Sequence, residues 1–425
     1  MHCLILQHPF HCATNFQEFC NNATKASDSF MLNLIAMTKP KLLFLAYVLG
    51  ILLPVTACRH QTPDSDVGET VELLQEFVIR YDKLCNEVSQ QQNPLPVTFP
   101  RSFKPDGSVR LTGPADMTSG YFAGILWMML DFAKEEKWKE RALKYTRSLE
   151  DQLEDFQNPG YAQKVLFGFG QAYSHTGDLK YFRMAEGASR ILSADIIDRL
   201  EERDKSPVGQ EWLAEPELWG NVELLAWSFQ QTQDPVYLNV ARLYADKALA
   251  HLPGQMVSLP VAGNRETELP SDIPPRSLAR AALGFLTLYE VTKNQEYLMK
   301  TRLLADLYIA GASADSVQVR TTQTATVSES YIFSDTEAAA VITCVLATLS
   351  LHQEEKDEYE RKATDILRIL SSTFRDRHKT RQEGIVSGTL PPSVTATQEE
   401  TLFVITDYYY ARALLTILRN DALKS

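Results

Sequence analysis

The feature that most constrains the fold is a joint that recurs between helical segments. At five places a polar turn is followed by an aromatic residue and then by an apolar stripe with spacing i, i+3, i+4 and i+7. The aromatic residues of these joints are Trp138, Tyr181, Tyr237, Tyr297 and Tyr359. A repeated joint of this kind is typical of helical hairpins that stack on one another, because a single hairpin cannot bury its apolar face alone.

The apolar periodicity predicts twelve helical segments, which make six hairpins, and β-strand alternation is nearly absent. The predicted bounds are 67–91, 118–134, 136–153, 161–175, 178–192, 216–232, 235–251, 275–292, 295–311, 334–353, 356–375 and 396–419. The first helix of a pair is apolar nearly all round and the second is charge-rich. An inner ring of apolar helices inside an outer ring of amphipathic helices is therefore expected. The predicted fold class is all-α, an (α/α)6 barrel formed by a single domain over 67–425.

Four long connections separate the predicted helices, at 193–215, 252–274, 312–333 and 376–395. Long connections in compact domains are usually functional. We expect them to gather at one end of the barrel and to shape a binding cleft.

The N-terminal region contains a targeting signal. An apolar run follows Lys39 and Lys41, is too short for a stable membrane span, and ends in "VTAC" at Cys58. This ending resembles the lipobox of bacterial lipoproteins, which implies lipidation of Cys58. We expect 1–58 to hold a mis-called start and a lipoprotein signal peptide, and 59–66 to be a tether. The protein would then be exported and held at a membrane of the bacterial cell envelope through its lipid anchor alone; a plain signal peptide with a chance cysteine is the alternative.

Charge and residue usage exclude several classes of partner. The formal net charge is −12 and the Lys and Arg residues are dispersed, so no nucleic acid is expected to bind. The 8 histidines show no metal-ligand spacing, and neither a metal nor another cofactor is predicted. Beyond Cys58, only Cys85 and Cys344 remain, and they are too far apart for a disulfide framework. Both are predicted to be buried free thiols.

Five blocks of the sequence carry a resemblance to a known family. They are "FPRSFKPDGSVRLTGPADMTSGYFAGILW", "NVELLAWSFQQTQDPVYLNVARLYADKAL", "PPRSLARAALGFLTLYEVTKNQEYL", "SDTEAAAVI" and "EETLFVITDYYYARALL". In this order they are similar to blocks of bacterial unsaturated glucuronyl hydrolases. The resemblance implies an (α/α)6 barrel that releases a 4,5-unsaturated uronic acid from the non-reducing end of oligosaccharides. In that reaction a carboxylic acid protonates the double bond of the sugar, and water adds to the cation-like centre.

The resemblance also assigns roles to individual residues. The catalytic aspartate of the family falls on Glu217, with Asn221 four residues later on the same helical face. A family arginine falls on Arg276, where it could meet the carboxylate of the substrate. Asp116 and Trp219 complete the predicted substrate-binding set.

The chain departs from the family pattern at several of these positions. The second family aspartate would fall near Gly160, where this chain has no acid, and an expected tryptophan is replaced by Met117. The arginine of the family precedes a Gly-Gln-Ala-Trp segment, whereas Arg276 precedes Ser277, Leu278 and, at the end of the segment, Arg280. The predicted active site is therefore partly degenerate.

The residues themselves also permit structural roles. Glu217 in a first helical turn could simply stabilise the helix dipole, and tryptophan at helical spacing, as at Trp219, often packs in a core. Asp116 could be a helix cap. Asp335 is interpreted as a helix-start residue and Asp407 as a buried structural acid.

The sequence leads to two alternative functions. The first is a glycoside hydrolase that removes a terminal unsaturated uronic acid or a related sugar from oligosaccharides. The alternative is a catalytically impaired, lipid-anchored relative that binds glycans. In both cases the ligand is a small carbohydrate in a pocket framed by the loops around Asp116, Gly160, Glu217, Arg276 and Thr389.

Overall fold

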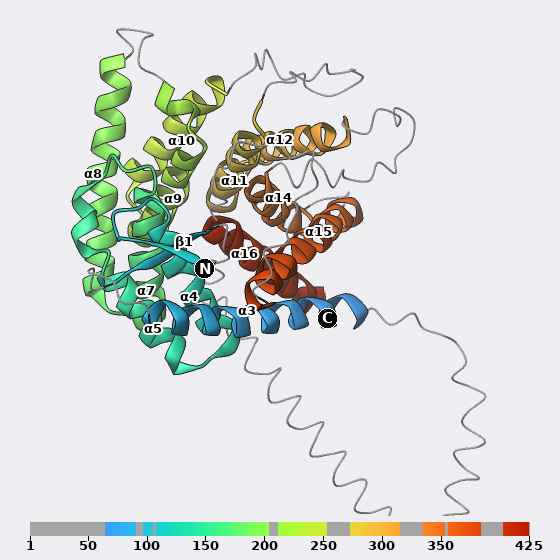
Figure 1. The fold of residues 1–425 in the computed structure, drawn as a ribbon. Coiled ribbons are helices and arrows are strands. Elements are labelled where there is room, and N and C mark those ends of the chain that lie inside the picture. Colours follow the sequence, from blue (N-terminus) through green and yellow to red (C-terminus); the bar gives the residue numbers. More distant parts are fainter. Residues whose placement is uncertain are drawn as a thin grey trace, which may run out of the picture. The chain divides into compact units, whose positions relative to one another are not determined.

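The computed structural model describes residues 64–90, 97–104, 108–203, 211–252, 273–314, 335–352, 356–383 and 403–424 (Figure 1). Cys58, the predicted tether before 64 and the predicted loop at Thr389 lie outside these ranges. Backbone contacts divide the chain into Thr70–Asn420 and a second unit made of Met1–Glu69 and Asp421–Ser425. The candidate site lies in the larger unit.

The inner helices of the larger unit are buried along most of their length. They are α4 (Ser119–Ala133), the continuous run of α6 (Tyr161–Gln163), η2 (Lys164–Gly170) and α7 (Gln171–Thr176), then α9 (Gly220–Thr232), α11 (Pro275–Thr292), α14 (Thr336–Leu349) and α16 (Phe403–Lys424). In α14 all but two of the residues are buried, which matches the apolar character of "EAAAVITCVLATL". Burial on all sides is expected of a helix in the inner ring of a barrel.

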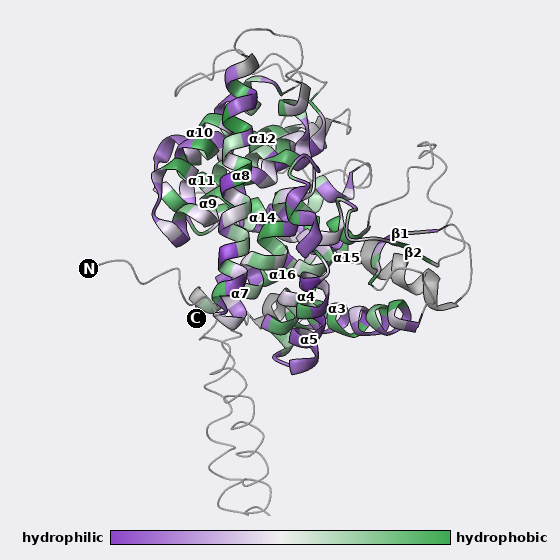
Figure 2. Ribbon diagram, turned by 90° about the vertical axis from the view of Figure 1, so that its left-hand side faces the viewer, coloured by the Kyte–Doolittle hydropathy of each residue, from purple (hydrophilic) through white to green (hydrophobic). Residues whose placement is uncertain are grey.

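The outer helices are amphipathic. They are α3 (Asp64–Gln90), α5 (Glu136–Arg147), α8 (Leu179–Arg203), α10 (Pro235–Ala250), α12 (Gln295–Ala314) and α15 (Lys356–Glu383). Figure 2 shows hydrophilic and hydrophobic residues alternating along α8, as expected for a helix with one buried and one solvated face. Five inner helices contact the outer helix that follows them in sequence, and these pairs are α4–α5, α7–α8, α9–α10, α11–α12 and α14–α15.

The sixth hairpin joins the two ends of the unit. The Tyr81 hydroxyl on α3 donates a hydrogen bond to Oδ2 of Asp407 on α16 (2.9 Å), and Phe77 packs against Tyr410. On its other side α16 contacts α4, because the ring of Tyr408 fills the space beside Gly124. The inner ring is thus closed, and the predicted (α/α)6 barrel is confirmed. Asp407 is fully buried, in agreement with a structural role.

The recurring joint of the sequence has a common backbone geometry. Four inner helices end at a residue with positive φ, and these residues are Lys134, Gly177, Gln233 and Lys293. Two positions later an outer helix begins, with a side-chain oxygen accepting from its first turn at Asp178, Asp234 and Asn294. A left-handed residue followed by an Asx cap reverses the chain within a few residues. The aromatic residue after each joint is buried.

A small antiparallel hairpin was not expected from the sequence. β1 (Phe99–Phe103) pairs with β2 (Val109–Thr112), in a register that places Phe99 opposite Thr112. Phe99 is fully buried and meets Phe122 and Tyr145 edge-on. The hairpin was missed because its strands are short and carry Pro100, which is unfavourable in a strand interior.

Several predicted helix bounds also change. The segment predicted as 136–153 ends at Arg147 and continues as the 3-10 turn η1 (Glu150–Glu154). α8 extends to Arg203 and α15 extends to Glu383. The loops predicted at 193–215 and 376–395 are therefore helical in their first part. Within the described ranges, no helix is both long enough and apolar enough to span a bilayer.

A half-buried histidine joins the C-terminal ends of α4 and α7. The Nε2 atom of His175 lies 2.9 Å from Oδ1 of Asp131, and its Nδ1 atom lies 2.8 Å from the carbonyl oxygen of Gln171. The ring also stacks on Trp127. Burial lowers the pKa of His175, but the hydrogen bond and charge of Asp131 outweigh it, so the pKa is raised. Both ring nitrogens face acceptors, which favours the protonated imidazolium.

Candidate active site

The first turns of the inner helices bring the predicted acid and cation together. Glu217 lies in the 3-10 turn η4 (Pro216–Trp219) that leads into α9, and Arg276 lies in the first turn of α11. Oε1 of Glu217 is 3.7 Å from Nη1 of Arg276. The Glu217 side chain is 17% exposed and that of Arg276 is 36% exposed, so both are accessible to a ligand.

Arg276 is surrounded by carboxylates. Its Nε and Nη2 atoms lie 3.2 and 3.3 Å from the two oxygens of Asp335, and Nη1 lies 3.7 Å from Oε2 of Glu337. Burial lowers the pKa of Arg276, but the charges of Glu337, Asp335 and Glu217 raise it overall. Arg276 is therefore a permanent cation, with a planar orientation set by Asp335.

Asp335 has the helix-start role that the sequence suggested. Its Oδ1 accepts a hydrogen bond from the backbone N–H of Ala338 at 3.0 Å, which caps α14. The same carboxylate holds Arg276. One residue thus sets the start of α14 and the orientation of a site cation.

A second guanidinium lies below Arg276, one turn further along α11. Arg280 is 1% exposed, and its Nη2 atom is 2.7 Å from Oε1 of Glu337 and donates to the Tyr121 hydroxyl at 3.0 Å. Its Nη1 atom donates to the Tyr409 hydroxyl. The four side chains come from α4, α11, α14 and α16, so the network ties four inner helices together.

The two tyrosines of this network are neutral phenols near pH 7. Burial raises the pKa of Tyr121 to about 12, although the charge of Arg280 opposes the rise. Burial also raises the pKa of Tyr409 well above its usual value. The fixed charges of the inner site are therefore those of the carboxylates and guanidinium groups.

Sequence reasoning missed Arg280, Glu337, Tyr121 and Tyr409 as site residues. A signal existed, because an arginine and a glutamate each interrupt an otherwise apolar inner helix, and charged residues are almost never fully buried unless paired. Their pairing joins positions 57 residues apart, which periodicity alone does not reveal.

A further ion pair, with a buried glutamate and a partly exposed arginine, lies beyond Tyr409. Nη1 of Arg412 on α16 is 2.7 Å from Oε2 of Glu223 on α9, and the Glu223 side chain is 7% exposed. The barrel interior thus carries paired charges at more than one level.

The backbone around Glu217 is held by α6. The side-chain amide of Gln163 donates to the carbonyl oxygen of Glu217 at 2.9 Å. The amide fits because residue 220 is glycine: a Cβ on Gly220 would lie 2.1 Å from Nε2 of Gln163. The position of the candidate acid therefore depends on α6 as well as on its own turn.

Asp116 lies in a different part of the mouth. Its Oδ2 pairs with Nε of Arg101 at 3.0 Å, and its Oδ1 accepts from the backbone N–H (2.9 Å) and hydroxyl (2.7 Å) of Thr118. These contacts shape the turn before α4. A role for Asp116 in substrate binding stays a prediction.

The same turn is fastened to the neighbouring helix. Nζ of Lys164 donates to the carbonyl oxygen of Ala115 at 2.8 Å, and the side-chain amide of Asn158 donates to the same oxygen at 2.9 Å. Lys164 is 1% exposed, and burial lowers its pKa to about 8. Lys164 thus has a structural role, and burial destabilises its protonated form.

The structure explains the missing acid at Gly160. A Cβ added there would lie 2.1 Å from the carbonyl oxygen of Met117, well inside contact distance. No side chain fits at this position without moving the backbone. The second family aspartate therefore cannot be supplied by residue 160 in this backbone.

The structure places Trp219 in the core, and its predicted contact with the substrate stays a prediction. Trp219 is 2% exposed and packs against Phe285 and Tyr244, with its ring filling the space beside Gly284. It is a core residue between η4, α10 and α11. Asn221 is 4% exposed, one residue into α9, and its role in binding stays a prediction.

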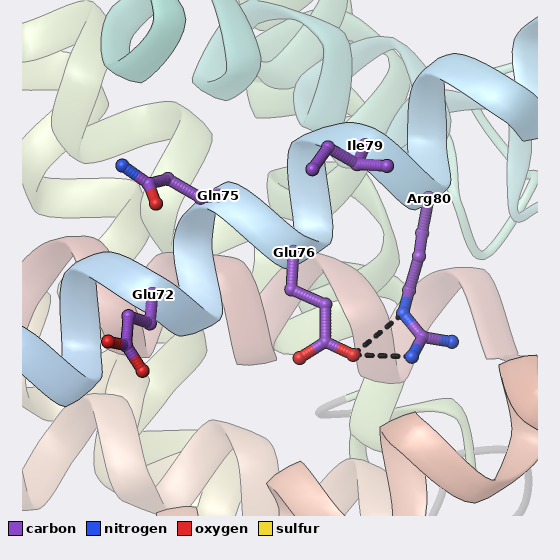
Figure 3. Close-up of a pocket in the computed structure, with 5 residues that line it drawn as sticks. All are labelled: Glu72, Gln75, Glu76, Ile79 and Arg80. Atoms are coloured by element: carbon purple, nitrogen blue, oxygen red, sulfur yellow. Dashed lines mark hydrogen bonds and ion pairs between the residues drawn. The ribbon is translucent and has the colours of Figure 1, made fainter.

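A separate hollow lies on the outer surface of α3 (Figure 3). Glu72, Gln75, Glu76, Ile79 and Arg80 line it, and Glu76 pairs with Arg80 one turn later. All five residues come from one helix. This hollow shares no residue with the Glu217 cluster.

Comparison with known proteins agrees with the fold and with the resemblance. Two unsaturated glucuronyl hydrolases are 25% identical to this chain: the enzyme of Bacillus sp. (strain GL1) over 346 residues, 74% of this chain and 90% of the relative, and that of Formosa agariphila over 364 residues, 78% and 86%. No family model matches the chain.

Solved structures of unsaturated glucuronyl hydrolases share the fold. A heparin-specific enzyme superimposes with a TM-score of 0.59 at 20% identity, covering 83% of this chain and 97% of the other. The Bacillus sp. GL1 enzyme gives 0.58 at 18% identity, covering 82% and 96%. A Streptococcus agalactiae variant complexed with dGlcA-GalNAc6S gives 0.54 at 15% identity, covering 83% and 91%. The chain is thus similar in sequence to two unsaturated glucuronyl hydrolases and shares the fold of the solved ones.

Proposed function

We propose that the protein is a glycoside hydrolase that acts on oligosaccharides ending in an unsaturated uronic acid or a related sugar. The observation that carries the proposal is the meeting of Glu217 and Arg276, 3.7 Å apart, at the mouth of the barrel. The resemblance of the sequence to unsaturated glucuronyl hydrolases, two of which are 25% identical to this chain over most of their length, supports functional roles for both residues. An accessible carboxyl beside a fixed cation suits acid catalysis on an anionic sugar.

In the proposed reaction Glu217 is the proton donor. Its carboxyl proton is added to one carbon of the sugar double bond, and the π electrons form the new C–H bond. Water then adds to the neighbouring carbon, which bears the ring oxygen, and returns a proton to the Glu217 carboxylate. The product is a hemiketal that opens and releases the remaining oligosaccharide.

Arg276 is the proposed partner of the uronate carboxylate. Asp335 binds the edge of the guanidinium group formed by Nε and Nη2, and the Arg276 side chain is still 36% exposed. A bidentate contact would place the double bond of the sugar near Glu217. Asn221 and Asp116 are proposed to contact sugar hydroxyls.

We expect turnover to be slow, because the site lacks the second aspartate of the family at Gly160. Losing one positioned proton-transfer group typically costs about 10²–10⁴-fold. Residue 160 cannot carry an acidic side chain, because a Cβ there would collide with the carbonyl oxygen of Met117. This absence favours a second candidate function, a glycan-binding relative with impaired catalysis. Both functions use the same pocket and the same small carbohydrate.

The test is a paired measurement of turnover and binding. Purified protein is incubated with unsaturated disaccharides of several linkages, and loss of the ultraviolet absorbance of the conjugated double bond is followed. The same sugars and neutral oligosaccharides are screened by thermal shift. Slow turnover supports the hydrolase; stabilisation without turnover supports the binding relative. Stabilisation by long polymers alone would contradict both.

Export and lipid anchoring at Cys58 are also proposed, on the resemblance of "VTAC" to a lipobox. Metabolic labelling with palmitate in a bacterial host tests this. Label should enter the wild-type protein and be absent from Cys58→Ala. Equal labelling of Cys58→Ala would rule out this anchor.

A further inference from the structure

The charges around Arg276 do not balance. Among the described residues, the carboxylates of Glu217, Asp335 and Glu337 meet the guanidinium groups of Arg276 and Arg280 within 4 Å. The cluster therefore has an excess of one negative charge. A uronate bound to Arg276 would add another. Like charges at one site favour the uptake of a proton by one of the carboxylates.

Asp335 is a poor acceptor for that proton. Its two oxygens accept from Nε and Nη2 of Arg276 at 3.2 and 3.3 Å, and Oδ1 also accepts from the backbone N–H of Ala338 at 3.0 Å. Hydrogen bonds of this kind stabilise the ionised form. Protonation would also weaken the cap of α14.

Glu337 is a poor acceptor for a different reason. Its Oε1 accepts hydrogen bonds from both Nε (3.2 Å) and Nη2 (2.7 Å) of Arg280. The side chains of Glu337 and Arg280 are both at most 5% exposed. Protonating Glu337 would leave the guanidinium of Arg280 buried without a counter-charge, which is strongly unfavourable. The neutral phenols of Tyr121 and Tyr409 cannot replace that charge.

Glu217 lacks comparable support. Its closest charged partner among the described residues is Nη1 of Arg276 at 3.7 Å, which is longer than a hydrogen bond. Arg276 is also the proposed partner of the ligand. When Arg276 turns to a uronate, Glu217 loses its cation and gains an anionic neighbour.

We infer that Arg280 and Glu337 form a positioning pair that keeps Glu337 ionised and so directs the proton to Glu217 when an anionic sugar binds. The inference rests on the proposed function and adds to it a coupling between ligand binding and proton uptake. A new negative charge about 6 Å from Glu217, at an effective dielectric constant of ~20, raises its proton affinity roughly a hundredfold. The ligand itself would thus produce the acid that the reaction needs.

Calorimetry in two buffers of different ionisation enthalpy tests the coupling. The probe is a saturated glucuronyl disaccharide, which carries the uronate but has no double bond to react. Its methyl ester is the neutral control. We expect wild-type protein to take up a proton on binding the disaccharide, most at mildly acidic pH and progressively less from neutral to alkaline pH, and to take up none with the ester.

Three variants separate this role from simple structural support. Glu217→Gln should bind the disaccharide without proton uptake. Glu337→Gln removes the excess negative charge, so uptake should fall while the disaccharide still binds. The double variant Arg280→Met with Glu337→Gln restores the charge excess and should restore uptake. A merely structural pair would weaken disaccharide binding and proton uptake together in Glu337→Gln, whereas the inferred pair lowers the number of protons taken up per disaccharide bound.

Persistent uptake in Glu217→Gln would overturn the inference, as would uronide binding by wild type with no uptake over that pH range. Failure of wild type to bind any uronide would also overturn it. The proposed hydrolase activity is judged separately, by turnover of unsaturated disaccharides. Binding with proton uptake but no turnover would retain the inference and reject the hydrolase.

Discussion

The contact between α4 and α6 predicts the effect of a single added methyl group. A Cβ on Gly120 would lie 2.5 Å from the backbone nitrogen of Lys164 and 2.6 Å from the carbonyl carbon of Gln163. Backbone atoms cannot rotate away, so Gly120→Ala must push α6 from α4. Gly187, within α8, has nothing within 4 Å of the same added atom and is the matched control.

The two substitutions should have opposite effects on the free energy of unfolding. Replacing glycine by alanine inside a helix stabilises by about 0.5–1 kcal/mol, and this is the whole effect expected of Gly187→Ala. At Gly120 the overpacking should cost about 1–3 kcal/mol and outweigh the helix preference. Because both variants gain the helix preference, we expect them to differ by the overpacking cost, about 1–3 kcal/mol.

Urea unfolding followed by circular dichroism measures the difference, with the slope of the transition compared to confirm that the compactness of the unfolded state is unchanged. Gly120→Ala should also lower any turnover, because α6 carries the Gln163 amide that holds the Glu217 backbone. A neutral or stabilising Gly120→Ala would refute the close approach of α4 and α6 and the support it gives to Glu217.

Three further predictions concern the interior. The raised pKa of His175 contributes stability that is fully present below its unfolded pKa of about 6.5 and is lost as pH rises through the folded pKa. His175→Gln should remove this slope of stability against pH, and an unchanged slope in the variant would exclude His175 as its cause. Removing one partner of the buried pair, as in Glu337→Gln, should cost about 3–5 kcal/mol, whereas Arg280→Met with Glu337→Gln should cost much less, which chemical unfolding of both variants checks. Burial raises the pKa of Cys344 to about 12, so its thiol should react with a thiol reagent only after denaturation, and rapid labelling of native protein would show that α14 opens.

The helical architecture could be predicted because each joint has a local cause. The prediction for 216–232 matches η4 and α9, and that for 235–251 matches α10 within a residue. A left-handed residue and an Asx cap are encoded within four positions, at Gln233 and Asp234, so the turn can be inferred from a short window. Cys85 and Cys344 are buried and free, as predicted.

The site could be predicted only in part, because its partners are distant in sequence. The placement of Glu217 and Arg276 at helix starts followed from local pattern and resemblance, but their 3.7 Å approach joins η4 to α11. The sequence predicted that Trp219 contacts the sugar because Trp219 lies in the same helical turn as Glu217, whereas the residues that pack against its ring could not be inferred. Its burial depends on Gly284, more than sixty residues away. Long-range packing of this kind leaves no trace in periodicity.

The most direct test of the central claim compares two glutamates on the same turn. Glu217→Gln removes the candidate acid, while Glu215→Gln removes an exposed carboxyl two residues earlier, at the start of η4. Initial rates on an unsaturated disaccharide are measured for wild type and both variants, with thermal unfolding to confirm that each is folded. The account predicts slow wild-type turnover, retained in Glu215→Gln and abolished in Glu217→Gln. Turnover that survives Glu217→Gln would show that another residue supplies the proton.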